Sequence, residues 1–228
     1  MTTLLKVRLL AFASAFAMVA LPDQAFAQIC HGTPGRGGIA YERGLEALST
    51  SHGASATFAG NRTAFNINAS VFGKTPENTS RAAGARFSMQ FHANRLAICP
   101  GLGLGYGRNV WTVPQGPVGD VSITTHAVAL RPGVAVGLAQ PVFRGVTLIP
   151  SLGVKYAYKV WYLSSKSEGD VFPSGDTASV VEIEYGLTAQ YRNVYLGWSA
   201  LRDSDSDGLR PIAARFFLGI TWGVGRKE

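Results

Sequence analysis

A strict two-residue alternation runs through residues 83–93 and, after the short turn at 93–95, through residues 96–106. In the first segment Phe87 lies among apolar side chains on one face, whereas Arg86 lies among polar side chains on the other. A period of two predicts β-strands, because successive side chains of a strand point to opposite faces. The short turn makes the two strands antiparallel neighbours. Each has about the 9–11 residues that a tilted strand needs to cross a bilayer. The apolar face must therefore be covered either by a protein core or by lipid.

The same alternation recurs along the rest of the chain and predicts an all-β fold. The expected strands are residues 38–44, 51–59, 64–72, 83–93, 96–106, 128–138, 146–162, 181–191, 194–200 and 212–224. Short turns near 61, 94, 142 and 192 alternate with longer loops at 73–81, 108–120, 163–178 and 202–210. Such alternation is typical of an up-and-down antiparallel transmembrane β-barrel, which has an even number of strands. We expect ten strands, with 38–44 as the tenth; an eight-strand barrel with this early segment as a plug is the alternative.

The N-terminus has the features of a secretory signal peptide. Lys6 and Arg8 precede an apolar run at 9–21, and Ala-Phe-Ala ends at Ala27, so cleavage is expected between Ala27 and Gln28. No later window is long and apolar enough for a transmembrane helix. The expected organisation is a signal peptide at 1–27, a periplasmic lead-in at 28–37 and an outer-membrane barrel domain at 38–228.

The polar faces of the strands carry the charged residues, as expected of the interior of a narrow barrel. The predicted lumen network comprises Arg86, Gln90, Arg131, Lys155, Lys159, Glu182, Glu184 and Arg215. Many neighbouring positions on these faces are glycine or alanine, which leaves room for long side chains. Because an isolated buried charge is costly, we expect ion pairs, first of all between the two lysines and the two glutamates. The network has two interpretations: a structural filling of a closed barrel, or an anion-favouring pore or binding barrel.

Two cysteines in an exported chain predict a disulfide between Cys30 and Cys99, which would pin the lead-in to the barrel mouth. Residues 203–208 have the ligand spacing of the start of a calcium loop, but Ala214 occupies the position of the bidentate glutamate. This segment is therefore interpreted as an acidic surface loop, and no metal site or cofactor is expected.

Catalysis has little support in the sequence. His126 shares a strand face with Ser122 and Thr124, as in a lipid-modifying barrel enzyme, but no carboxylate partner is evident. A Gly-x-Ser-x-Gly pattern is missing from the sequence. We therefore predict that the protein is not an enzyme.

The net charge of +7 comes from scattered residues rather than a basic stripe, which argues against nucleic-acid binding.

The chain resembles the small outer-membrane β-barrel family of Gram-negative bacteria. The resemblance rests on the leader that ends at Ala27, the alternating segments and the final strand with its apolar residues Phe216, Leu218, Ile220 and Trp222. Family members often end on an aromatic residue, whereas residues 225–228 follow the strand here. The resemblance implies an outer-membrane location, with membrane lipid and the barrel-assembly machinery as partners and possible surface ligands at the four long loops. The implied role is structural, surface-interacting or passively permeating. A soluble periplasmic β-barrel or sandwich is the alternative.

Overall fold

The structure is a computed structural model of the chain, and it describes Cys30 and residues 36–46, 49–60, 62–75, 78–114, 120–165, 176–204 and 213–223. The predicted signal peptide and most of the predicted lead-in lie outside these residues. Among the residues described, no helix is long and apolar enough to span a membrane.

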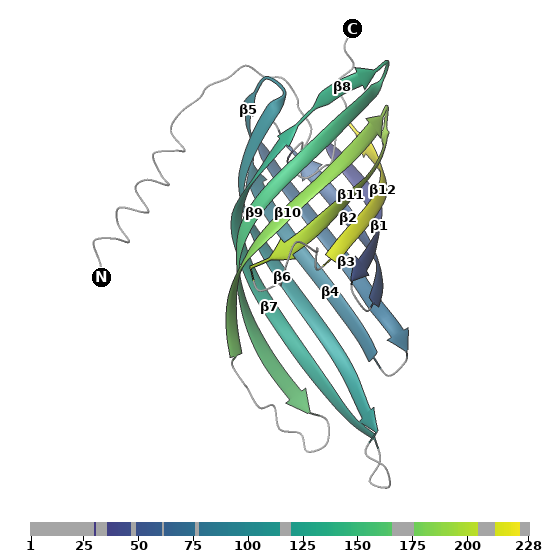
Figure 1. The fold of residues 1–228 in the computed structure, drawn as a ribbon, viewed down its shortest axis with the longest axis vertical. Helices are drawn as coiled ribbons and strands as arrows, with labels where there is room; N and C mark the ends of the chain where they lie inside the picture. The colour runs from purple at the N-terminus through teal and green to yellow at the C-terminus, as the bar shows by residue number, and fades with distance from the viewer. Residues whose placement is uncertain are drawn as a thin grey trace, which may run out of the picture.

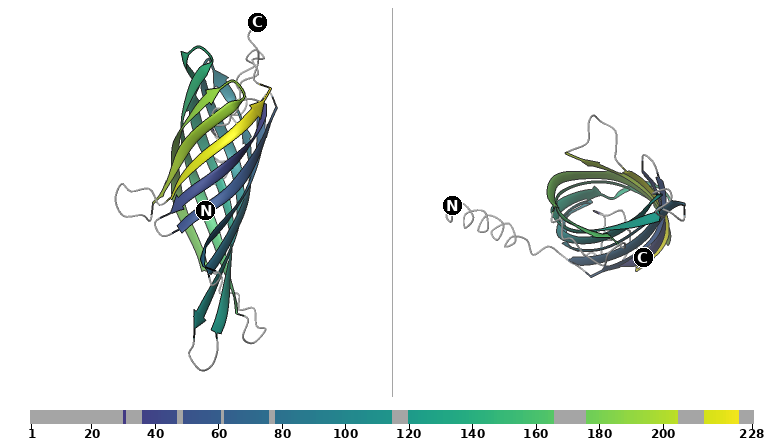
Figure 2. Two further views of the ribbon diagram at one scale, coloured as in Figure 1. Left: turned by 90° about the vertical axis from the view of Figure 1, so that its right-hand side faces the viewer. Right: turned by 90° about the horizontal axis from the view of Figure 1, so that it is seen from below.

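The described chain forms one closed antiparallel β-barrel of ten strands (Figures 1 and 2). The strands are β1 (Gly37–Glu46), β2 (Ser49–Ala59), β3 (Thr63–Thr75), β4 (Asn78–Met89), β6 (Leu96–Pro114), β7 (Asp120–Leu138), β9 (Val146–Ser165), β10 (Asp176–Tyr191), β11 (Val194–Asp203) and β12 (Ala213–Trp222). Two short segments, β5 (Phe91–Ala93) and β8 (Gln140–Phe143), continue β4 and β7 after one-residue interruptions. Each strand pairs with its neighbours in sequence, and β1 closes the barrel against β12. The ten-strand prediction is confirmed, and the eight-strand alternative is wrong because β1 pairs along its whole length with both β2 and β12.

Several strands run well beyond their predicted ends, so the predicted loops are too long. Only two residues separate β3 from β4, inside the predicted loop at 73–81. Strands β6 and β7 reach Pro114 and Asp120, β9 and β10 reach Ser165 and Asp176, and β11 continues to Asp203. These extensions mix polar and apolar residues on both faces, as Val110 and Trp111 of β6 show, so they lack a clean alternation, but they still pair with their neighbours.

The apolar side of every strand faces outward. Phe87 is 48% exposed, Leu104 55% and Leu218 57%, whereas inward positions such as Ala129 and Ala135 are buried. On β6 the outward apolar positions run from Leu96 to Tyr106. Ten steps of about 3.3 Å along a strand tilted by about 40° give a band about 25 Å tall, the height expected of a membrane-facing apolar band.

The longer connections all lie at one end of the barrel. The four short turns around Arg62, Asn94, Arg144 and Arg192 lie at the end where β1 begins and β12 ends (Figure 1). The three longer connections, which follow β6, β9 and β11, lie at the opposite end together with the two-residue connections that follow β1 and β3. In barrels of the outer membrane this arrangement places short turns in the periplasm. We call these the short-turn end and the long-loop end.

Candidate functional site: the charged lumen

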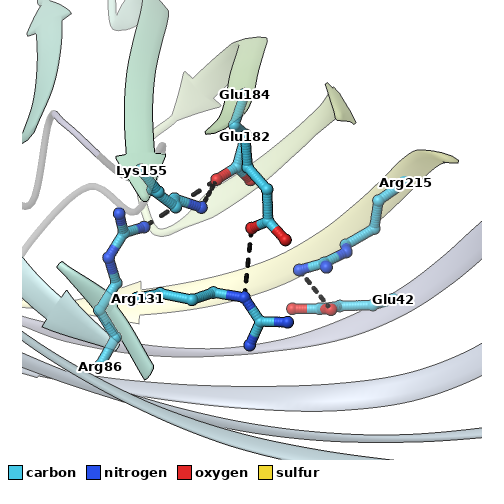
Figure 3. Close-up of polar contacts among 7 residues, drawn as sticks. All are labelled: Glu42, Arg86, Arg131, Lys155, Glu182, Glu184 and Arg215. Atoms are coloured by element: carbon cyan, nitrogen blue, oxygen red, sulfur yellow. Dashed lines mark hydrogen bonds and ion pairs between the residues drawn. The ribbon is translucent and has the colours of Figure 1, made fainter. Parts of the chain in front are cut away.

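The inward charges of six strands converge inside the barrel (Figure 3). Arg86 lies on β4, Arg131 on β7, Lys155 and Lys159 on β9, Glu182 and Glu184 on β10, Arg215 on β12 and Glu42 on β1. They line a cavity of about 490 Å³, together with small residues from the other strands. The structure therefore brings seven of the eight predicted lumen residues into one cluster, and Gln90 lies apart from it.

Glu184 is the centre of the first group of ion pairs. Its carboxylate accepts a hydrogen bond from the ammonium of Lys155 on the neighbouring strand and lies 4.0 Å from the guanidinium of Arg86. Strands β4 and β10 are four strands apart in a ten-strand barrel, so they lie on nearly opposite walls. The contact between Arg86 and Glu184 therefore reaches across the lumen.

Glu182 is the centre of the second group. Its Oε2 accepts a hydrogen bond of 3.2 Å from Nε of Arg131, and its Oε1 lies 3.2 Å from Nζ of Lys159. The Glu182 side chain is only 4% exposed, because cations from two strands enclose it. Each of the two glutamates thus pairs with two basic groups, so no charge in either group is isolated from an opposite one, although each group keeps one net positive charge.

A fifth ion pair, separate from the two groups, joins Glu42 to Arg215 at 3.3 Å, between β1 and β12 where the barrel closes. Sequence reasoning missed Glu42, because the short segment 38–44 has too few residues to establish its register. A signal was nonetheless present: Ile39 and Tyr41 alternate with Ala40 and Glu42, which puts the carboxylate on the inward face.

Glycine provides the space that the long side chains occupy. A Cβ at Gly105 would collide with the guanidinium of Arg131, so this side chain lies directly over Gly105. A Cβ at Gly133 would lie 2.9 Å from Cα of Lys155 and 2.5 Å from the carbonyl oxygen of Val154. Small inward residues therefore fit the charged cluster into a narrow barrel.

The short-turn end of the lumen contains the disulfide. Cys30 and Cys99 are bonded, with Cα atoms 6.1 Å apart, as the sequence predicted. They pack with Ala97, Ala135 and Ile149 in a small buried cluster. The disulfide thus fixes the chain before β1 to the inner wall of β6.

Gln90 lies near the same end, at the interruption between β4 and β5. Its side chain is 2% exposed, and its backbone N–H donates to the carbonyl oxygen of Arg62 at 2.7 Å. It contributes to the inner wall, not to the ion pairs.

In the part of the chain that the structure describes, the other candidate groups do not form a second site. His126 lies on the outward face of β7, where its Nδ1 is 2.7 Å from the hydroxyl of Tyr106; the side chain of Ser122 is outside the described part of the structure. Asp203 ends β11, and most of the predicted calcium-like loop is likewise not described. Within the described residues, no group of three or more His, Cys, Asp or Glu side chains could hold a metal ion.

Comparison with known proteins found no matching family model and no similar curated protein. Several solved structures resemble the chain. The translocator domain of the autotransporter NalP from Neisseria meningitidis has a TM-score of 0.48 and 10% identity, over 81% of this chain and 85% of that one. The beta domain of the Bordetella autotransporter Brka has a TM-score of 0.43 and 11% identity, over 82% and 98%. The KdgM porin has a TM-score of 0.37 and 12% identity, over 80% and 96%. At these values the likeness carries no argument about function, and the description of the barrel rests on its own strand pairing.

Proposed function

We propose that this chain is an integral outer-membrane barrel with a structural or surface-interacting role, that it is not an enzyme, and that ion pairs close its lumen. The location is supported by the outward apolar band of about 25 Å and by the position of the three longer connections, which all lie at one end. Lipid would cover the band, and the long connections would be available to ligands at the cell surface.

The contact between Arg86 and Glu184 carries the proposal of a closed lumen. Two side chains from nearly opposite walls meet at 4.0 Å, and Lys155 joins them from a third strand. Strands spaced about 4.8 Å apart give a ten-strand barrel a backbone diameter of about 20 Å, so the side chains fill much of this width. A pore that conducts freely would not have such a bridge.

Passive, anion-favouring permeation is the second candidate. Five basic side chains share three carboxylates in the cluster, which leaves an excess of two positive charges. A lumen with this excess would favour anions if the bridge opened.

Conductance across planar bilayers separates the two candidates. We expect the wild-type protein to give no stable channel, and a variant with Arg86, Lys155 and Glu184 all replaced by Ala to give one, because the whole bridge is then removed. The variant Arg62→Gln with Arg192→Gln is the control, since both arginines lie on exposed turns. Stable anion-selective channels in the wild type that Lys155→Ala and Lys159→Ala weaken would support the pore instead. Recovery of the native protein in the soluble fraction, without heat-modifiable migration in gels, would contradict both.

A further inference from the structure

A row of basic side chains crosses the outer surface of six strands at the edge of the apolar band that is nearer to the long-loop end. We call it the basic row: Arg43, His52, Arg81, Arg108 and His126. The pairing register aligns them, with Val71 between the second and third members: Arg43 opposes His52, His52 opposes Val71, Val71 opposes Arg81, Arg81 opposes Arg108 and Arg108 opposes His126. Residues directly opposite on antiparallel strands point to the same face. All five therefore point outward, as do the apolar residues next to them on the side of the short-turn end.

The row lies where the apolar band ends. Arg108 follows Tyr106, the last residue of the unbroken outward apolar run on β6, and Arg81 adjoins the outward Ala83 on β4. An outward arginine costs about 2–4 kcal/mol at the bilayer midplane but only about 0–1 kcal/mol near the interface. The row is therefore placed at the level of lipid head groups.

Arg81 and Arg108 are directly opposite each other on β4 and β6, and both are exposed. Like charges at opposite positions destabilise a sheet, since their Cβ atoms are only about 4.5–5.5 Å apart. Among the outward side chains described on β1, β2, β3, β4, β6 and β7, none is a carboxylate. The protein places two guanidinium groups together here without a negative charge of its own between them.

Two tyrosines support the histidines of the row in the same way. The hydroxyl of Tyr41 is hydrogen-bonded to Nδ1 of His52, and that of Tyr106 to Nδ1 of His126 at 2.7 Å. Each tyrosine lies two residues before an arginine of the row, so a Tyr-x-Arg segment faces a histidine on β1–β2 and again on β6–β7. Tyrosine is enriched at membrane–water interfaces, and here it also fixes the imidazole rings.

We propose that the basic row binds the phosphate of an anionic lipid head group in the leaflet at the long-loop end, centred on Arg81 and Arg108. The planar guanidinium fork matches phosphate, and one phosphate between two arginines turns their repulsion into attraction. A lipid is the source of the phosphate because the row borders the apolar band, where acyl chains would lie against Leu104 and Val128. This inference rests on the proposed membrane location.

The test compares stability and lipid retention in bilayers of two compositions. Protein is inserted into vesicles of phosphatidylcholine alone or with diphosphoryl lipid A, and insertion is first verified by heat-modifiable migration. In phosphatidylcholine, Arg81→Gln should leave the urea midpoint unchanged or raise it, because it relieves repulsion. With lipid A, the same substitution should lower the midpoint. Retention of lipid A should fall about 25-fold in Arg81→Gln with Arg108→Gln, at about fivefold for each arginine near an anionic surface.

The control variant Arg62→Gln with Arg192→Gln removes the same charge at the short-turn end and should leave lipid A retention unchanged. Failure of the native protein to insert would contradict the membrane location. Insertion with equal midpoint shifts in the two compositions would overturn the phosphate site, as would an equal loss of retention in the control. Stabilisation by inorganic phosphate equal to that by lipid A would overturn the choice of a lipid.

Discussion

Glu184→Gln offers the most direct test of the ion-paired lumen. The substitution keeps the shape of the side chain but removes the carboxylate that Lys155 and Arg86 share. These two cations are only 12% and 19% exposed, so water replaces the lost partner poorly. Removing one member of a buried ion pair costs about 3–5 kcal/mol. Because Glu184 itself is 29% exposed, we expect the lower limit, a loss of about 3 kcal/mol in the free energy of unfolding.

The loss is measured by urea unfolding of the barrel in lipid vesicles, followed by tryptophan fluorescence and heat-modifiable migration. With a urea dependence of about 1–3 kcal/mol per molar, the midpoint should fall by about 1–3 M. The matched control is Arg215→Gln, whose side chain is 45% exposed in its pair with Glu42 and should cost no more than about 1 kcal/mol. The double variant of Glu184→Gln with Lys155→Met should recover part of the loss, because it also removes the unpaired ammonium.

Equal losses for Glu184→Gln and Arg215→Gln would refute this reasoning. So would a double variant that is no more stable than Glu184→Gln alone. Either result would mean that the lumen is hydrated well enough to screen its charges, and the proposal of a closed lumen would fail with it.

Two further outcomes follow from the packing. The disulfide closes a chain separation of 69 residues, so Cys30→Ser with Cys99→Ser should lose about 4 kcal/mol of unfolding free energy, and dithiothreitol should lower the urea midpoint of the wild type but not of this variant. Gly133→Val should cost about 1–3 kcal/mol, because its Cβ would press on the backbone of β9, whereas Gly107→Val should cost nothing, since no atom lies within 4 Å of a Cβ there. Equal midpoints for the two glycine variants would contradict the close packing described at Gly133.

The sequence predicted the number of strands and the direction of their apolar faces because one requirement acts on all of them. Across the apolar band, outward positions such as those of Phe87 and Leu104 require apolar side chains. Charged side chains such as that of Arg86 are confined to the inward positions. The alternation therefore repeats in every strand. The disulfide was predictable for a different reason: the chain contains only two cysteines.

The strand extensions, the basic row and Glu42 were not predictable in this way. Beyond the band polar and apolar residues are mixed on both faces, so Arg81 and Arg108 fell in segments interpreted as loops. Their opposition follows from the register of β4 with β6, which no local pattern encodes. Glu42 lies in a strand whose predicted part was short. The features that the sequence did not reveal thus depend mainly on how segments pair with one another, not on the residue pattern within each segment.

Arg131 and Arg108 have the same side chain but lie on opposite faces of the barrel wall, where the sources of a negative partner differ. Arg131 points inward, where the surrounding wall is protein, and the chain itself provides the carboxylate of Glu182. Arg108 points outward beside Arg81, where lipid or solvent molecules can reach the two guanidinium groups. A counter-charge has to be encoded only where the surroundings cannot provide one. Loss of a lumen carboxylate should therefore destabilise the barrel in every lipid, whereas the contribution of the basic row should depend on the lipid composition.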